Sequence, residues 1–164
     1  MAKSIGKGVS TSSEDIRSAL EKLQINAVDM LLNTGGLAIG SSAKAKVLIA
    51  NTIYAMIDGV LVKKTTAEIA LSGTVTNAKF NVFVLSMNAS GTVTATMGTE
   101  GATIGAVVFP AVPDDQVVLG FVIVNPTGTG NFVGGTTELG DATVVPNAVY
   151  VNTPYPFNPN ALSL

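Results

Sequence analysis

The chain has 164 residues, contains no Cys and no His, and is 47% hydrophobic but only 12% charged. Without those two residue types it can form neither disulfides nor thiolate metal sites, and it lacks the usual Ser/His and Cys/His catalytic pairs. No apolar run approaches the roughly 18 residues that a membrane helix needs. Its mean hydropathy of +0.47 therefore indicates surface shared with copies of the chain or with another protein.

The charges are unevenly distributed along the sequence. All nine basic residues lie at or before Lys79, together with six acidic residues, whereas five acidic residues and no base follow. This division suggests two faces with different partners, or charges that are simply solvated near the N-terminus. The excess of base is too small for a nucleic-acid footprint, so no nucleic-acid partner is expected.

The composition of residues 1–10 is typical of a flexible arm. These residues lack the apolar region of a secretory signal, so we expect the protein to be made and kept in a cytoplasm. Thr11 or Ser12 then provides an N-cap with a carboxylate three residues later. Near-helical spacing follows at Ile16, Leu20, Leu23, Val28 and Leu31. The pattern predicts a helix from about Ser13 to Leu32, which packs either on its own sheet or in a bundle with other subunits.

From residue 37 onward, β-branched residues and turn signals predict strands. The segment 46–57 fits either a helix or a strand, but the following Asp58-Gly59 pair favours a β-hairpin. Further strands are expected at 68–75, 79–87 and 92–97, with a turn at 88–91 before the last of them.

The most apolar stretch, Val117–Val124, predicts a central strand buried on both faces. It follows a turn at Pro113-Asp114-Asp115 and is stopped by the Pro- and Gly-containing segment 125–131. Strands are also expected at 104–109, 143–145 and 148–152.

These elements predict a mainly β fold, an antiparallel β-sandwich or small barrel with one N-terminal α-helix and an extended Pro-rich C-terminal tail. The expected division is an arm and helix over residues 1–36, a β domain over 37–153 and a tail over 154–164. Tyr155 and Phe157 in that tail would dock on a neighbouring subunit or remain free.

The sequence predicts no catalytic, cofactor-binding or metal-binding residues. Carboxylates are the remaining option for catalysis, and the candidates are Glu100, Asp114, Asp115, Glu138 and Asp141. Turn capping is the ordinary explanation for Asp114 and Asp115. Glu138 and Asp141, with Asn131, carry the oxygen ligands that Ca²⁺ prefers, but their spacing matches no EF-hand.

The glycine-rich stretch 128–135 superficially matches a phosphate-binding loop. It has Val133 where the last glycine of the pattern should stand, and no helix-forming segment follows. Asn88-Ala89-Ser90 fits a glycosylation sequon but is expected to be a turn. The sequence therefore predicts a protein that is not an enzyme and has no cofactor.

Several short sequence segments of the β region resemble segments of small virion structural proteins of tailed bacteriophages. These are accessory head proteins of the decoration, cement or head-fibre kind. The resemblance covers roughly residues 70 to 153, and its segments are Lys79–Val84, Met97–Gly101, Val108–Pro110, Gly120–Thr137 and Val145–Asn147.

The resemblance implies a β-rich, non-enzymatic virion protein, often a homotrimer, that binds the major capsid protein and stabilises or decorates the bacteriophage capsid. The N-terminal arm and helix, or the Pro-rich tail, would be the attachment element. The alternative is a receptor- or glycan-binding fibre-like module of the virion.

Overall fold

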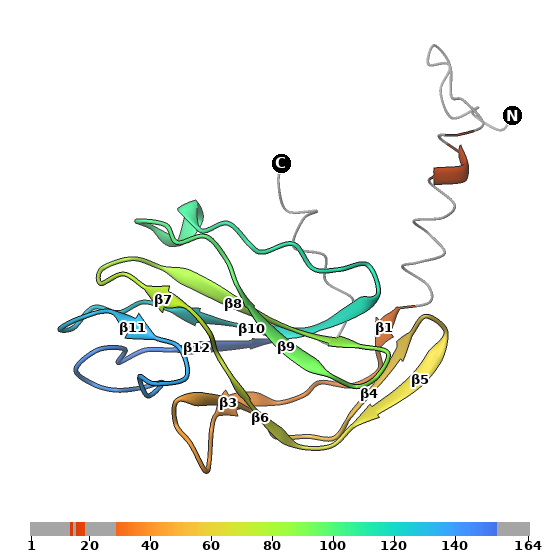
Figure 1. Ribbon diagram of the computed structural model, residues 1–164, viewed down its shortest axis with the longest axis horizontal. Coiled ribbons are helices and arrows are strands. Elements are labelled where there is room, and N and C mark those ends of the chain that lie inside the picture. The colour runs from red at the N-terminus through yellow and green to blue at the C-terminus, as the bar shows by residue number, and fades with distance from the viewer. Residues whose placement is uncertain (1–13, 15, 19–28, 154–164) are drawn as a thin grey trace, which may run out of the picture.

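The structure is a computed structural model that describes Glu14, residues 16–18 and residues 29–153 (Figure 1). Its elements are β1 (Met30–Leu31), β2 (Leu37–Ile39), β3 (Lys46–Ile49), β4 (Ile53–Ile57), β5 (Val60–Lys64), β6 (Ala67–Ala70), β7 (Thr74–Val75), β8 (Asn81–Asn88), β9 (Val93–Met97), the 3₁₀ helix η1 (Ile104–Ala106), β10 (Gln116–Val124), β11 (Phe132–Val133) and β12 (Val149–Asn152). The expected mainly β class is confirmed.

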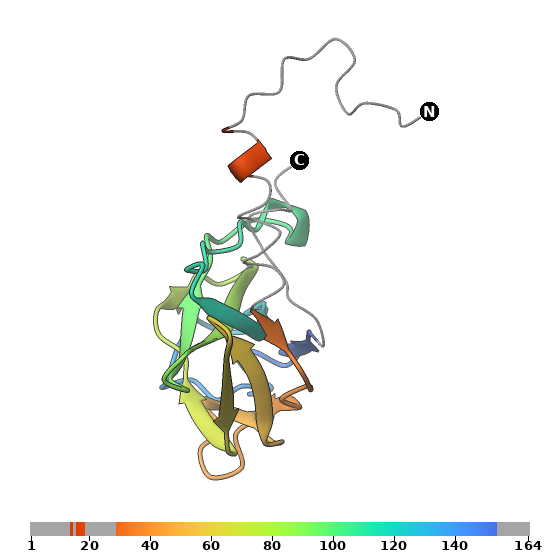
Figure 2. The ribbon, with the colours of Figure 1, turned by 90° about the vertical axis from the view of Figure 1, so that its right-hand side faces the viewer.

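The strands form four antiparallel sheets, with orders β12-β10-β8-β9, β1-β4-β5, β2-β3-β6 and β11-β7. The four-stranded sheet packs face to face with the two three-stranded sheets, as Figures 1 and 2 show. The described residues form no closed barrel, so the arrangement is sandwich-like.

The N-terminal boundary differs from the prediction. Glu14 and Ile16–Ser18 are helical, but Met30–Leu31 pair with β4 instead of ending the predicted helix at Leu32. Leu31 is buried opposite Ala55, because pairing with a sheet outweighs a helical apolar spacing at this point. The β region thus begins near Asp29, before the expected boundary at residue 37. Residues 19–28 and the predicted tail, 154–164, lie outside the described residues.

The predicted central strand is confirmed as β10, which lies between β8 and β12. Its register with β8 shifts between Val118 and Gly120. This β-bulge changes the alternation of side chains, so that Val122 and Val124 face the main core and Phe121 faces the other side of the sheet. Both faces of β10 are consequently covered, as its apolar composition predicts.

The main core lies between the opposed sheets. Phe83 of β8 and Phe132 of β11 are fully buried there, with their rings edge to face at a centroid distance of 5.9 Å. The two ends of the described body also meet, because the Leu37 N–H donates to Asn152 Oδ1 at 2.8 Å. This bond therefore links β2 to β12, strands of two different sheets.

A second, smaller apolar cluster covers the opposite face of the β8–β10 pair. Phe109, in the segment between η1 and β10, packs edge to face on Phe121 at 5.2 Å. Figure 1 shows this segment crossing the sheet. The predicted strand at 104–109 is wrong: residues 104–106 form η1, and only Val108 forms a β-bridge, to Thr99. Val107 and Phe109 of this segment cover the sheet instead of extending it.

Two further predictions have clear outcomes. The segment 46–57 resolves into β3 and β4, and β4 joins β5 in the predicted hairpin, with φ values of 51° at Asp58 and 73° at Gly59. These left-handed values fit a type I′ turn. The predicted strand at 143–145 is wrong, because Asp141 organises it as a turn through the Val145 N–H to Asp141 O bond of 2.8 Å.

Candidate functional site

Two of the acidic side chains that the sequence singled out cap backbone turns. Glu100 Oε2 accepts from the Thr76 N–H at 2.9 Å, and this bond is the main reason that the pKa of Glu100 lies below its ordinary value. Asp141 Oδ1 accepts from the hydroxyl of Thr143 at 2.6 Å and from its N–H at 2.7 Å. These two bonds lower the pKa of Asp141. Both groups therefore stay ionised at neutral pH, as acceptors in turns.

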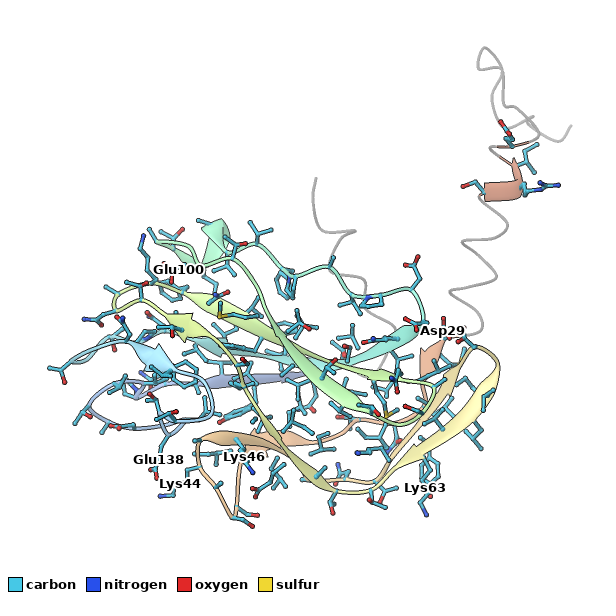
Figure 3. All side chains as sticks on the ribbon, in the orientation of Figure 1. Asp29, Lys44, Lys46, Lys63, Glu100 and Glu138 are labelled. Atoms are coloured by element: carbon cyan, nitrogen blue, oxygen red, sulfur yellow. The ribbon has the colours of Figure 1, made fainter. Side chains whose placement is uncertain are left out.

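The candidate carboxylates do not all converge on one place. Figure 3 shows Glu100 and Glu138 on opposite sides of the molecule. Asp114 and Asp115 are exposed in the turn that precedes β10, which the Gln116 N–H closes by donating to Pro113 O at 3.2 Å. The geometry offers no pairing of Glu100 with Glu138 for acid–base chemistry.

The calcium interpretation also lacks geometric support. Asn131 Oδ1 accepts from the Asn77 N–H at 2.9 Å, while Asp141 is bonded to Thr143. In the part of the chain that the structure describes, no three Asp or Glu side chains gather in a way that could hold a metal ion. Asn131 Oδ1 and Asp141 Oδ1, two of the proposed ligand atoms, thus have structural bonds to backbone or hydroxyl donors.

The glycine-rich loop has a packing role. Its N–H groups at Thr127 and Thr129 donate to Val144 O and Thr143 O, at 3.2 and 2.8 Å. A Cβ on Gly128 would overlap Thr143 O. Glycine is needed here because two loops lie backbone to backbone, and the Thr127 and Thr129 N–H groups are already bonded to the second loop.

Asn88 holds the hairpin turn between β8 and β9. Its Oδ1 accepts from the Ser90 N–H at 3.1 Å, the Ser90 hydroxyl at 2.7 Å and the Thr92 N–H at 3.0 Å. The expected turn is confirmed, and the sequon matches the residues that an Asx-turn requires.

Sequence reasoning missed the role of Glu68. Its Oε1 accepts from the Ser42 N–H at 2.6 Å and the Ser41 hydroxyl at 3.1 Å, and its Oε2 from the Ala43 N–H at 3.2 Å. The Ser42 bond is the main cause of its lowered pKa. The partners are separated by 25 to 27 residues, so no local motif could have revealed them.

The division of charge along the sequence is not kept at every edge of the molecule. Lys44 O accepts from the Leu139 N–H at 2.9 Å, which brings Glu138 next to Lys44 (Figure 3). An acidic residue of the second half thus lies beside a basic residue of the first. At this edge the division of charge along the sequence is therefore not a division in space.

An exposed apolar surface lies on β1, β4 and β5. We call it the outer β1–β4–β5 face, and it consists of Met30, Leu32, Tyr54, Met56, Leu61 and Lys63. Of these, Leu61 is 61% exposed, Leu32 50% and Tyr54 40%. The strand alternation in 53–57 could have identified it, since the intervening Ile53, Ala55 and Ile57 are buried in the core. Ile104 and Val108 form a smaller exposed pair near η1.

The class that the geometry defines is a mainly β, antiparallel sandwich-like protein whose polar side chains mostly organise turns. Comparison with family models, curated proteins and solved structures found no match. Within the described residues, no helix has both the length and the apolar character needed to cross a membrane.

Proposed function

We propose that this chain is a non-enzymatic structural protein of a tailed-bacteriophage virion, which binds the outside of the capsid lattice and stabilises or decorates it. Its main partner would be the major capsid protein. The protein would be made in the host cytoplasm and act as a homo-oligomer, with a trimer favoured by the resemblance.

The observation that carries the proposal is the spatial grouping of the segments that resemble accessory head proteins. Segment 79–84 contains the beginning of β8, and segment 97–101 begins at the last residue of β9. The β-bridge between Phe80 and Gly101 joins the two segments. Val108 bridges to Thr99, and Phe109 packs on Phe121 of β10. Segments 79–84, 97–101 and 108–110, together with the β10 part of segment 120–137, are scattered in the sequence but therefore meet on one sheet and its covering segment.

The chemistry of the surface supports the same proposal. Glu68, Glu100 and Asp141 are engaged in turns, so the described carboxylates with lowered pKa values have structural roles. Exposed apolar side chains are common on β1, β4 and β5, as expected for a protein whose surface is buried in an assembly.

Binding to heads tests the proposal. The purified full-length chain would be mixed with heads of the phage that encodes it, prepared without this protein, and sedimented with them. We expect saturable co-sedimentation and a higher temperature of head disruption than in heads alone.

The result that would overturn the proposal is equally direct: no co-sedimentation, and no copy of the chain in purified virions. Presence in virions without binding to heads, together with saturable binding to host cells or glycans, would support the fibre-like alternative. An unrelated β-sandwich protein of similar charge serves as the control for non-specific adsorption.

A further inference from the structure

The outer β1–β4–β5 face is built from two cross-strand rows. Met30, Met56 and Leu61 lie side by side in one row, because Met30 pairs with Met56 and Met56 with Leu61. In the other, Tyr54 pairs with Lys63, and the Leu32 N–H donates to Tyr54 O at 2.9 Å. Directly paired residues of an antiparallel sheet share a face. The rows are thus one continuous surface.

This surface contains one charged side chain. Lys63 Nζ lies 5.9 Å from the centre of the Tyr54 ring, so its charge is at one end of an otherwise apolar area. Leu31, Ala55 and Val62, which alternate with these residues, are buried in the main core. The sheet is therefore apolar on both sides, although only one side is covered by the opposed sheet.

The position of the charges indicates what would cover the face. Lys63 is two residues from Leu61 along β5, and Asp58 is two residues from Met56 along the hairpin in the opposite direction. Asp58 is exposed in the turn. A base and an acid thus each stand two residues from the Met56–Leu61 row, in opposite directions, which is the pattern of a self-complementary surface.

We propose that the outer β1–β4–β5 face packs against the same face of a second copy of this chain. The two-fold axis passes through the Met56–Leu61 row and runs across the strands, so that the strands of the two copies are antiparallel. Each Lys63 then approaches the partner's Asp58, and the apolar side chains of the two faces meet between them.

The other two-fold arrangement is disfavoured by charge. An axis along the strands would place β5 of one copy over β1 of the other, and Lys63 would then lie on Leu32. That contact would remove the ammonium group from water without a carboxylate in return.

This contact goes beyond the proposed function and does not depend on it. A two-fold contact joins copies in pairs, so the chain in solution is a dimer or another even-numbered assembly. If a trimer forms through another surface, as the resemblance implies, this face would join two trimers into a hexamer.

Light scattering on the full-length protein tests the proposal. We expect Leu61→Lys, and independently Leu32→Lys, to halve the measured mass, since each places two ammonium groups in the apolar contact. Val108→Lys is the matched control, because Val108 is 60% exposed and Leu61 is 61% exposed. The control should keep the wild-type mass. Circular dichroism would verify that all three variants are folded.

A wild-type monomer would overturn the proposal, as would an unchanged mass in both Leu61→Lys and Leu32→Lys. Either result leaves head binding to be judged separately, because the co-sedimentation experiment does not measure the mass in solution.

The charges give a test of orientation. Lys63→Glu should weaken association at least tenfold, because it places like charges together at both ends of the contact. Asp58→Asn keeps a residue that accepts a left-handed conformation. Asp58→Asn should weaken association when it is made in the wild-type protein, but should strengthen association when it is made in Lys63→Glu. A weakening in both backgrounds would contradict the proposed orientation.

Discussion

At the scale of single residues, Tyr150 is a polar group in an apolar setting. It packs against the main core, and its buried hydroxyl has no hydrogen-bond partner among the described residues. Burial raises the pKa of Tyr150 to about 12. The neutral phenol is therefore the form that the folded state accepts, since the phenolate would lose its hydration.

We expect Tyr150→Phe to leave stability unchanged or to raise it by up to about 1 kcal/mol at neutral pH, because it removes an unpaired hydroxyl without removing the ring. Urea denaturation would measure the difference. A loss of more than about 1 kcal/mol would show that the hydroxyl is bonded in solution.

The pH dependence of the same variant has a definite sign. The pKa of Tyr150 rises on folding from its ordinary value of 10.0 to about 12. Its contribution to stability is thus complete below pH 10 and is lost between pH 10 and 12. The wild type should lose more stability than Tyr150→Phe across this range. Parallel curves would contradict the raised pKa.

At the scale of elements, the bulge in β10 depends on Gly120. Its φ is +154°, and a Cβ there would lie 2.6 Å from Leu37 Cδ1 and closer still to Val151 O. The bulge is also what directs Val122 and Val124 into the core. Gly120 therefore allows the backbone to form the bulge, and the bulge determines which face of the sheet each of the next four residues occupies.

Gly120→Ala should destabilise the protein by about 2–4 kcal/mol through steric overlap and backbone strain. Gly105→Ala is the control for the substitution itself, because nothing lies within 4 Å of its added Cβ. Gly130→Ala isolates strain, since its φ is +99° and its surroundings are open. Thermal denaturation should rank Gly120→Ala as the most damaging, and equal effects at Gly120 and Gly105 would contradict the bulge argument.

The elements also show what the sequence could reveal. Asp58-Gly59 and Asn88–Gly91 identified two hairpins, because those turns are specified by the residues that form them. The apolar run 117–124 identified the central strand for a similar local reason. The segments 104–109 and 143–145 were mistaken for strands, since β-branched residues favour extended backbone without specifying a pairing partner.

The same distinction holds for the candidate site. The sequence correctly predicted a turn at Asn88, where the hydrogen-bond donors and the accepting side chain lie within four residues of each other. It could not anticipate Glu68 with Ser42, or the contact of Gly128 with the Thr143 loop, because these depend on how distant segments meet.

At the scale of the whole molecule, the fold contains two apolar clusters on opposite faces of one sheet. Val82, Val84 and Val118 belong to the smaller cluster, and the neighbouring residues of the same strands belong to the larger one. The smaller cluster is covered by one crossing segment, so it can open without separation of the opposed sheets.

Phe109→Ala tests this independence. We expect a loss of about 2 kcal/mol from the half-buried ring, expressed mainly as local opening of the crossing segment. The paired Thr99 and Val108 N–H groups should then exchange hydrogen faster, while those between β8 and β10 stay protected.

Ile104→Ala, at a side chain that is 56% exposed, is the control and should change neither set of amides. Equal acceleration throughout β8 and β10 in Phe109→Ala would show instead that the two clusters unfold together.

The bond between Leu37 N–H and Asn152 Oδ1 has a consequence for synthesis. β10 receives its second neighbour, β12, only when residues 149–152 have been made. While the ribosome is still translating the preceding loops, a nascent chain has β10 as an open edge and β2 without its closing contact. An open strand edge of this kind can pair with other unfinished chains, so we expect slow synthesis of the last loops to lower the yield of folded protein.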